Sequence, residues 1–128
     1  MGKERYFHVK TTTSDGVVHD SKKEADRWCE LRLLERAGKI SDLKRQVPFE
    51  LIPAQYEAVP RYSKTGARLK DGQRCVERGV VYICDFEYVE NGKRVVEDVK
   101  SPATRKKESY IIKRKLMRFI YGIAVREV

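Results

Sequence analysis

The sequence of 128 residues predicts a single α+β domain in which helices flank a mixed β-sheet. Three patterns carry this prediction. Residues 21–37 and 105–121 have the apolar spacing of helices, and two strong strand segments, 80–89 and 94–100, are joined by an Asn-Gly turn. In chain order, with the weaker segments included, the elements run α-β-β-β-α-β after an N-terminal hairpin.

The first helix has the clearest boundaries in the N-terminal half. Residues 5–20 precede it and read as a hairpin around a Ser-Asp-Gly turn. Ser21 is a suitable N-cap, Glu24 follows it at capping-box spacing, and Gly38 comes just after the last helical turn. Residues 46–53 then alternate between apolar and polar, which predicts the strand that starts the sheet.

The following segment, residues 54–79, is basic and punctuated by glycine and proline, which predicts an extended hairpin or a mobile loop. We expect this segment to bind DNA phosphates. The side chains proposed for that role are Arg61, Lys64, Arg68 and Lys70.

The C-terminal third completes the expected sheet. After the strands at 80–89 and 94–100, a Ser-Pro break leads into the helix at 105–121. Gly122 is expected to end this helix, and residues 123–128 supply a closing strand.

Composition narrows the class of partner. The net charge of +9 favours a polyanion, and nucleic acid is the leading candidate. The chain has no apolar run long enough to span a membrane and no secretory leader, so membrane partners are not expected. Three cysteines without a C-x-x-C pair read as reduced structural thiols in a cytoplasmic protein.

The residues that point to chemistry lie on the two strong strands. Asp85 interrupts an apolar strand, where an uncompensated carboxylate is costly. Asp98 and Lys100 share one face of the next strand by period-two alternation, and an antiparallel pairing would bring Asp85 across from them. Two carboxylates and a lysine suit metal-assisted phosphodiester hydrolysis, although a cross-strand Asp–Lys surface pair is an equally open interpretation.

The ordered set of a helix, a strand with Asp85, a strand with Asp98-Val99-Lys100 and a basic helix resembles the PD-(D/E)XK nuclease superfamily, and in particular its small phage-encoded endonuclease-like proteins. The resemblance spans most of the chain outside residues 54–79. It implies a restriction-endonuclease-like core, Mg²⁺ or Mn²⁺ as cofactor, DNA as substrate, and a bacterial host cytoplasm as location.

Carried over by position, the resemblance implies that Asp85 and Asp98 ligate the metal together with the Val99 carbonyl, and that Lys100 is the catalytic lysine. It also implies an acidic residue on the first helix, for which Glu24 is the candidate. Glu24 has a second interpretation as the capping-box partner of Ser21, and the sequence leaves the two open. One departure from the superfamily pattern is Cys84, which stands where proline commonly precedes the first aspartate.

Three further acid–base candidates receive weaker support. Glu97 faces opposite to Lys100 by parity, so we expect it to be solvated or to face the second helix. His8 and His19 lie in the N-terminal hairpin, where structural roles are the more common ones, although His19 could approach the metal or the DNA.

The second helix is strongly basic. Lys113 shares its apolar face, so its ammonium group is expected either to join the active site or to extend along the core to solvent. The outward-facing residues predict a phosphate-binding stripe, with a solvated basic face as the simpler alternative. Those residues are Arg105, Lys106, Lys107, Arg114 and Arg118.

Three functions fit these patterns. The first is a metal-dependent DNA endonuclease acting in phage DNA replication, recombination or processing. The second is a non-catalytic nucleic-acid-binding accessory protein. The third is a structure-selective nuclease of the Holliday-junction-resolvase type, which is expected to act as a homodimer because a junction needs two symmetrical cuts.

Overall fold

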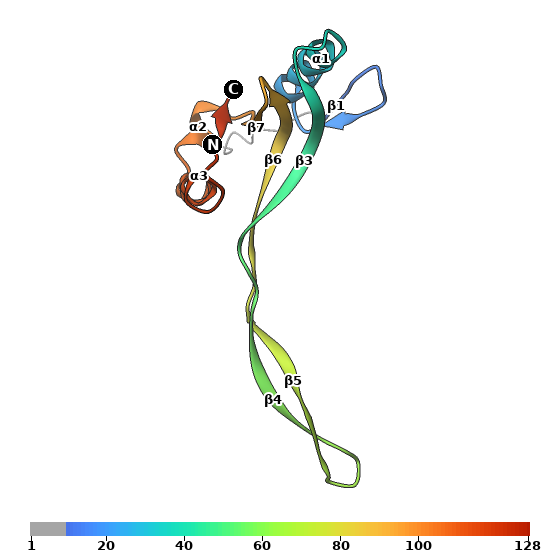
Figure 1. The fold of residues 1–128 in the computed structure, drawn as a ribbon, viewed down its shortest axis with the longest axis vertical. Helices are drawn as coiled ribbons and strands as arrows, with labels where there is room; N and C mark the ends of the chain where they lie inside the picture. Colours follow the sequence, from blue (N-terminus) through green and yellow to red (C-terminus); the bar gives the residue numbers. More distant parts are fainter. Residues whose placement is uncertain (1–9) are drawn as a thin grey trace, which may run out of the picture.

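The computed structural model describes residues 10–128 and has a mixed four-stranded sheet at its centre (Figure 1). The strand order is β3-β6-β7-β8, in which only the pairing of β7 with β8 is parallel. The strands are β3 Ser41–Ile52, β6 Val80–Glu90, β7 Lys93–Asp98 and β8 Arg126–Glu127. Helices lie on both faces of this sheet, which confirms the predicted α+β class.

Helix α1, Lys22–Arg36, matches the predicted helix closely. Ser21 is its N-cap, and the Ser21 side chain accepts a hydrogen bond from the backbone N–H of Glu24. Gly38 follows the helix with a positive φ of 73°, a backbone conformation that glycine adopts at little cost.

The predicted helix at 105–121 is wrong at its start, because the structure forms two helices there. Ser101 caps a short helix α2, Pro102–Arg105, which begins with proline at its first position. The chain then becomes extended at Lys107 before α3, Glu108–Tyr121, begins. Gly122 ends α3 in the left-handed conformation, as predicted.

The N-terminal hairpin is small. Strands β1, Thr11–Thr12, and β2, Val18–His19, pair antiparallel around the predicted turn. The rest of the expected hairpin, including His8, lies outside the described residues. Strand β3 begins five residues before the predicted 46–53 segment, because Ile40 and Leu43 pack into the cluster under α1.

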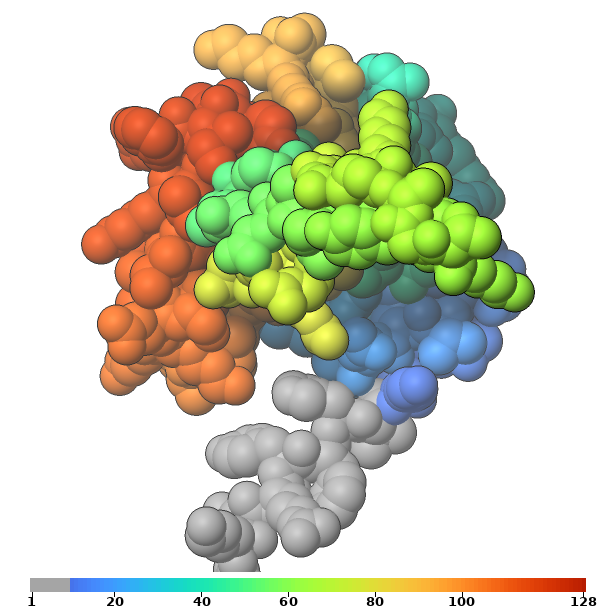
Figure 2. Space-filling view, turned by 90° about the horizontal axis from the view of Figure 1, so that it is seen from below, coloured from blue at the N-terminus to red at the C-terminus, as the bar shows by residue number. Residues whose placement is uncertain are grey.

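Residues 54–79 form the hairpin alternative of the prediction. Strands β4, Gln55–Tyr62, and β5, Arg68–Glu77, make a two-stranded sheet of their own. This β4–β5 ribbon extends far from the body in Figure 1, and Figure 2 views it end-on in front of the body. Whether it moves in the free protein stays a prediction.

The sheet separates two hydrophobic clusters. One lies against α3 and includes Cys84 and Met117, and the other lies against α1 and includes Trp28 and Phe86. Cys84 and Phe86 are two residues apart, so a regular strand would place both on one face. The faces therefore exchange at Asp85, which lies between them.

An irregular backbone at Gln46 lies directly beside this exchange. Gln46 lies on β3 between the residues paired with Cys84 and Phe86, and its φ of 53° is outside the β region. The irregularity gives Asp85 and Gln46 an orientation that neither strand would supply if it were regular.

Two other predictions concern membrane-spanning segments and the state of the cysteines. Among residues 10–128, no helix combines the length and the apolar character needed to cross a lipid bilayer. All three cysteines are free thiols, as predicted, but only Cys84 is buried, so a structural role fits this residue and not the exposed Cys29 and Cys75.

Candidate active site

The two aspartates meet where β6 and β7 pair. The register places Phe86 across from Glu97, so Asp85 and Asp98 lie beside each other at the end of the ladder. An oxygen of Asp85 accepts a hydrogen bond of 2.7 Å from the backbone N–H of Val99. The predicted convergence of these two carboxylates is therefore present.

Asp98 is the most deeply buried acid of the group, with no exposed surface. Its Oδ2 accepts a 2.5 Å hydrogen bond from the Tyr82 hydroxyl and lies 3.4 Å from the Lys100 Nζ. Its Oδ1 is buried and has no hydrogen-bond partner among residues 10–128. Burial, followed by the close approach of Asp85, raises the Asp98 pKa to about 8.

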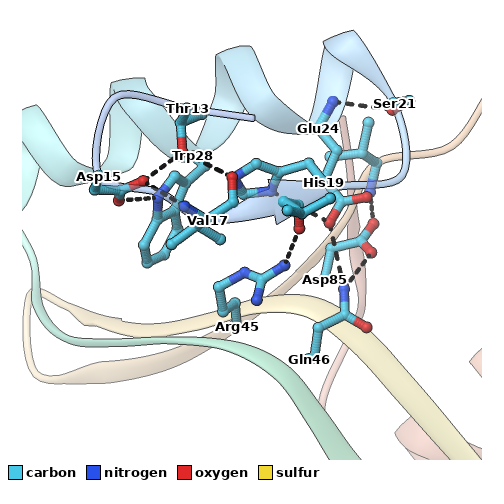
Figure 3. Close-up of polar contacts among 12 residues, drawn as sticks. Thr13, Asp15, Val17, His19, Ser21, Glu24, Trp28, Arg45, Gln46 and Asp85 are labelled. Carbon is cyan, nitrogen blue, oxygen red and sulfur yellow. Dashed lines mark hydrogen bonds and ion pairs between the residues drawn. The ribbon is translucent and has the colours of Figure 1, made fainter. Parts of the chain in front are cut away.

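Glu24 supplies a third carboxylate from α1. Its side chain does not complete the capping box but turns toward β3, where Gln46 Nε2 donates to it over 3.3 Å (Figure 3). Burial raises the Glu24 pKa to about 7, and the charges of Asp85 and Asp20 add to the increase. Gln46 also lies 3.5 Å from Asp85, so this amide links two acidic side chains.

Glu24 and Asp85 border a pocket of about 330 Å³, whereas Asp98 lies buried behind its lining. Three carboxylates and two lysines line this pocket, which is a mixture of charges expected for a site that binds a phosphate near a cation. The lining residues are Asp20, Ser21, Lys23, Glu24, Asp85, Val99, Lys100, Ser101 and Thr104.

His19 is buried next to the Glu24 carboxylate. It is 1% exposed, and its Nδ1 lies 3.7 Å from Glu24 Oε1, too far for a hydrogen bond. Burial and the charge of Arg45 lower the His19 pKa, which favours the neutral imidazole. Asp15 holds this hairpin on α1 by accepting a 2.7 Å hydrogen bond from the Trp28 indole (Figure 3).

The expectation for Glu97 is wrong. Glu97 is fully buried and faces α1, where one edge of the Arg27 guanidinium donates to its carboxylate from Nε and, over 3.0 Å, from Nη2. The Tyr88 hydroxyl donates to it over 2.6 Å. Parity correctly separated Glu97 from Lys100, but the helix covering that face is the first one, and it supplies an arginine.

The basic residues of the second helical region divide into three groups. Lys113 is half-buried and borders a groove that it shares with Lys100, whereas Lys106, Lys107 and Arg118 are exposed. Arg105 and Arg114 both pair with Glu127 at 3.2 Å. Two residues of the expected phosphate-binding stripe, Arg105 and Arg114, are therefore already paired with a carboxylate of the protein itself.

The four ribbon residues expected to bind DNA are all exposed and lie in the outer half of β4–β5 and its turn. Arg68 pairs with Asp71, and the other three are not placed near the acidic site. The structure thus keeps the ribbon charges and the acidic cluster in separate regions.

The donor set suits a hard divalent cation in two respects. One Asp98 oxygen is buried and has no hydrogen-bond partner among residues 10–128. In addition to burial, the nearby Asp85 carboxylate raises the Asp98 pKa, and a cation bound between the two would relieve this repulsion. Within residues 10–128, however, no three His, Cys, Asp or Glu side chains are grouped closely enough to form a metal cage.

Three neighbours of the site were absent from the sequence predictions. Gln46 depends on the irregular backbone of β3, and Tyr82 depends on the face that packs against α3. Asp20 directly precedes the N-cap of α1, and this position at a helix start is the one signal that could have indicated it.

Residues 3–126 match a family described as "Protein of unknown function (DUF1064)", so the chain belongs to that family. No curated protein and no solved structure matches the chain.

Proposed function

We propose that this member of the DUF1064 family is a divalent-metal-dependent DNA endonuclease of the PD-(D/E)XK type. The observation that carries the proposal is the contact between Asp85 and Asp98 beside Lys100, with a buried Asp98 oxygen that has no partner. Acids so close to each other are costly unless a cation or a proton shares them.

The residues have distinct roles in this proposal. Asp85, Asp98 and the Val99 carbonyl would hold Mg²⁺ or Mn²⁺, with Glu24 beside Asp85 through the shared Gln46 amide. The metal, when bound, would polarise the phosphate and favour deprotonation of a water molecule. Lys100 would stabilise negative charge on the phosphate, because its ammonium group is held at the pocket edge by Asp98.

Buried tyrosines support this arrangement. The Tyr82 hydroxyl fixes Asp98, and the Tyr110 ring lies 5.2 Å from the Lys100 Nζ, so both partners of the ion pair are held by aromatic side chains. The net charge of +9 supplies the attraction for a polyanion.

A non-catalytic DNA-binding protein is the second candidate. It is favoured by the lack of a ready metal cage among residues 10–128, and it would use the same basic surfaces. The two candidates differ in one measurable property, which is metal-dependent cleavage. A junction resolvase is a narrower form of the first candidate and would in addition require a homodimer.

The test is nicking of supercoiled plasmid with Mg²⁺, with Mn²⁺ and with EDTA. We expect the wild type to nick with either metal, and Asp98→Asn and Lys100→Ala to lose at least about 100-fold in rate, because each removes charge from the reacting centre. Asp42→Asn, an exposed aspartate, and Lys93→Ala, an exposed lysine, are the matched controls and should retain the rate. Equal nicking by all five proteins would indicate a contaminating nuclease and refute the proposal.

A further inference from the structure

A second groove adjoins the acidic pocket. It has a volume of about 320 Å³, and Lys100 and Thr104 border both spaces. Tyr110 lines the groove, and the Lys100 Nζ lies 5.2 Å from the centre of its ring. Whatever binds at Lys100 can therefore continue into this groove without crossing the body of the protein.

The chemistry of the groove differs from that of the pocket. Lys100, Lys107 and Lys113 border it, and its lining contains no carboxylate. Its floor is formed by β6, where Ile83 is 55% exposed and Val81 is 42% exposed. A site with three ammonium groups and an apolar floor matches a molecule that carries a phosphate next to an apolar sugar or base surface.

Tyr110 forms one wall of the groove. Its side chain is buried, and its hydroxyl is closed off from solvent and is influenced by the charges of Glu127 and Asp98, which do not line the groove. The surface that Tyr110 offers to the groove is therefore its ring and not its hydroxyl.

We propose that this groove binds the nucleotide next to the scissile phosphate in a single strand of DNA, with Lys107 and Lys113 on its phosphate and Val81 and Ile83 under its sugar or base. The inference rests on the proposed function, because the scissile phosphate is the group placed at Lys100. It assigns Lys113 to substrate binding and not to a reacting atom.

The experiment measures binding without chemistry. A fluorescein-labelled single-stranded 20-mer is titrated in EDTA across a salt series with the wild type, with Lys113→Gln and with Lys115→Gln. Both variants lose one charge from α3, but Lys113 is half-buried at the groove and Lys115 is exposed outside it. We expect Lys113→Gln to weaken binding about fivefold to tenfold and to reduce the log–log salt slope by about 0.7, the value for one single-strand phosphate contact.

A second pair tests the apolar floor. Ile83→Thr removes apolar surface from the groove, while Ile112→Thr does the same on an exposed part of α3 outside it. We expect a threefold or larger loss of affinity for the first variant, with no change in salt slope, and no loss for the second.

The outcomes separate the groove from the nuclease. Equal effects of the two lysine variants, or failure of the wild type to bind the 20-mer at low salt, would overturn the groove. Binding that depends on Lys113 and Ile83 in a protein that never cleaves DNA would sustain the groove and refute the nuclease. If the protein cleaves DNA but Lys113→Gln and Ile83→Thr bind the 20-mer as tightly as the wild type does, the nuclease would be sustained and the groove refuted.

Discussion

The body and the β4–β5 ribbon use charge in opposite ways. In the body, the acids Glu24, Glu97 and Asp98 are buried, and each is held by a specific partner or a neighbouring charge. In the ribbon, the charged residues of β4, β5 and their turn are exposed. The ion pair between Arg74 and Glu57, for example, joins two largely exposed side chains.

This difference follows from the amount of core in each region. The body packs two hydrophobic clusters around its sheet, which can offset the cost of burying charge. The ribbon contributes no residue to either cluster, and an isolated two-stranded hairpin is only marginally stable. Buried charge can therefore be positioned precisely in the body, while the ribbon can only present charge to solvent or to a partner.

The largest expected effect compares one ion pair from each region. Arg27→Ala should lower the free energy of unfolding by about 3 kcal/mol, because it leaves the fully buried Glu97 without its cation. Arg74→Ala should lower it by less than about 0.5 kcal/mol, since Arg74 and Glu57 are solvated. Urea unfolding at pH 7 measures both values.

A second substitution should restore the stability that is lost when Arg27 is replaced. Arg27→Met fills similar volume without charge and should be nearly as destabilising as alanine, because Glu97 remains buried and unpaired. Adding Glu97→Gln to Arg27→Met should recover most of the lost stability. A similar loss for Arg27→Ala and Arg74→Ala would mean that burial does not distinguish the two regions.

An intermediate effect is expected for DNA affinity. Replacing Lys64 and Lys70 with alanine should weaken binding to a duplex about tenfold and reduce its log–log salt slope by about two, because each lost phosphate contact removes about 0.9. Fluorescence anisotropy across a salt series measures the slope. Lys39 and Lys93, exposed at the opposite end of the body, form the matched control pair.

An unchanged slope in the Lys64/Lys70 variant would show that the ribbon does not reach the DNA backbone. An equal reduction in the Lys39/Lys93 variant would show that only the overall charge matters. Either result would mean that the exposed charges of the ribbon have no specific role in binding DNA.

The sequence predicted the aspartate pair because local rules determine it. The Asn-Gly turn fixes the register of β6 with β7, as the positive φ angles of Asn91 and Gly92 show. Period-two alternation then places Asp98 with Lys100 and brings Asp85 alongside. Both steps use only residues within one hairpin, whereas the orientation of the Asp85 side chain also involves the irregular stretch around Gln46 in β3.

The remaining parts of the site depend on which element covers each face, which no local rule gives. Glu97 was expected near solvent or the second helix because parity specifies a face but not the arginine that α1 brings to it. Gln46 was missed because its positive φ breaks the alternation of β3. The break between α2 and α3 was missed because the Ser-Pro cap starts a helix earlier than the apolar spacing indicates.

The smallest expected effect concerns stability against pH. The folded-state pKa of Glu24 is about 7, above its ordinary value of 4.5, so the folded protein binds the proton more tightly than the unfolded chain does. Stability from this group is therefore present at pH 4 and is lost as pH rises to about 7. Glu24→Gln cannot titrate, so in EDTA it should exceed the wild type by about 1 kcal/mol at pH 8 and match it near pH 4.

Thermal melts in EDTA between pH 4 and pH 8 measure this crossover. Glu57→Gln is the ribbon control, because Glu57 is exposed and its replacement should leave the pH profile parallel to that of the wild type. Both variants keep Asp98, whose pKa is raised by burial and by the nearby Asp85, so some dependence on pH will remain in each. If the stability of Glu24→Gln and of the wild type changed in parallel with pH, Glu24 would be solvated. Its charge would then cost no more in the pocket than the charge of Glu57 costs on the ribbon surface.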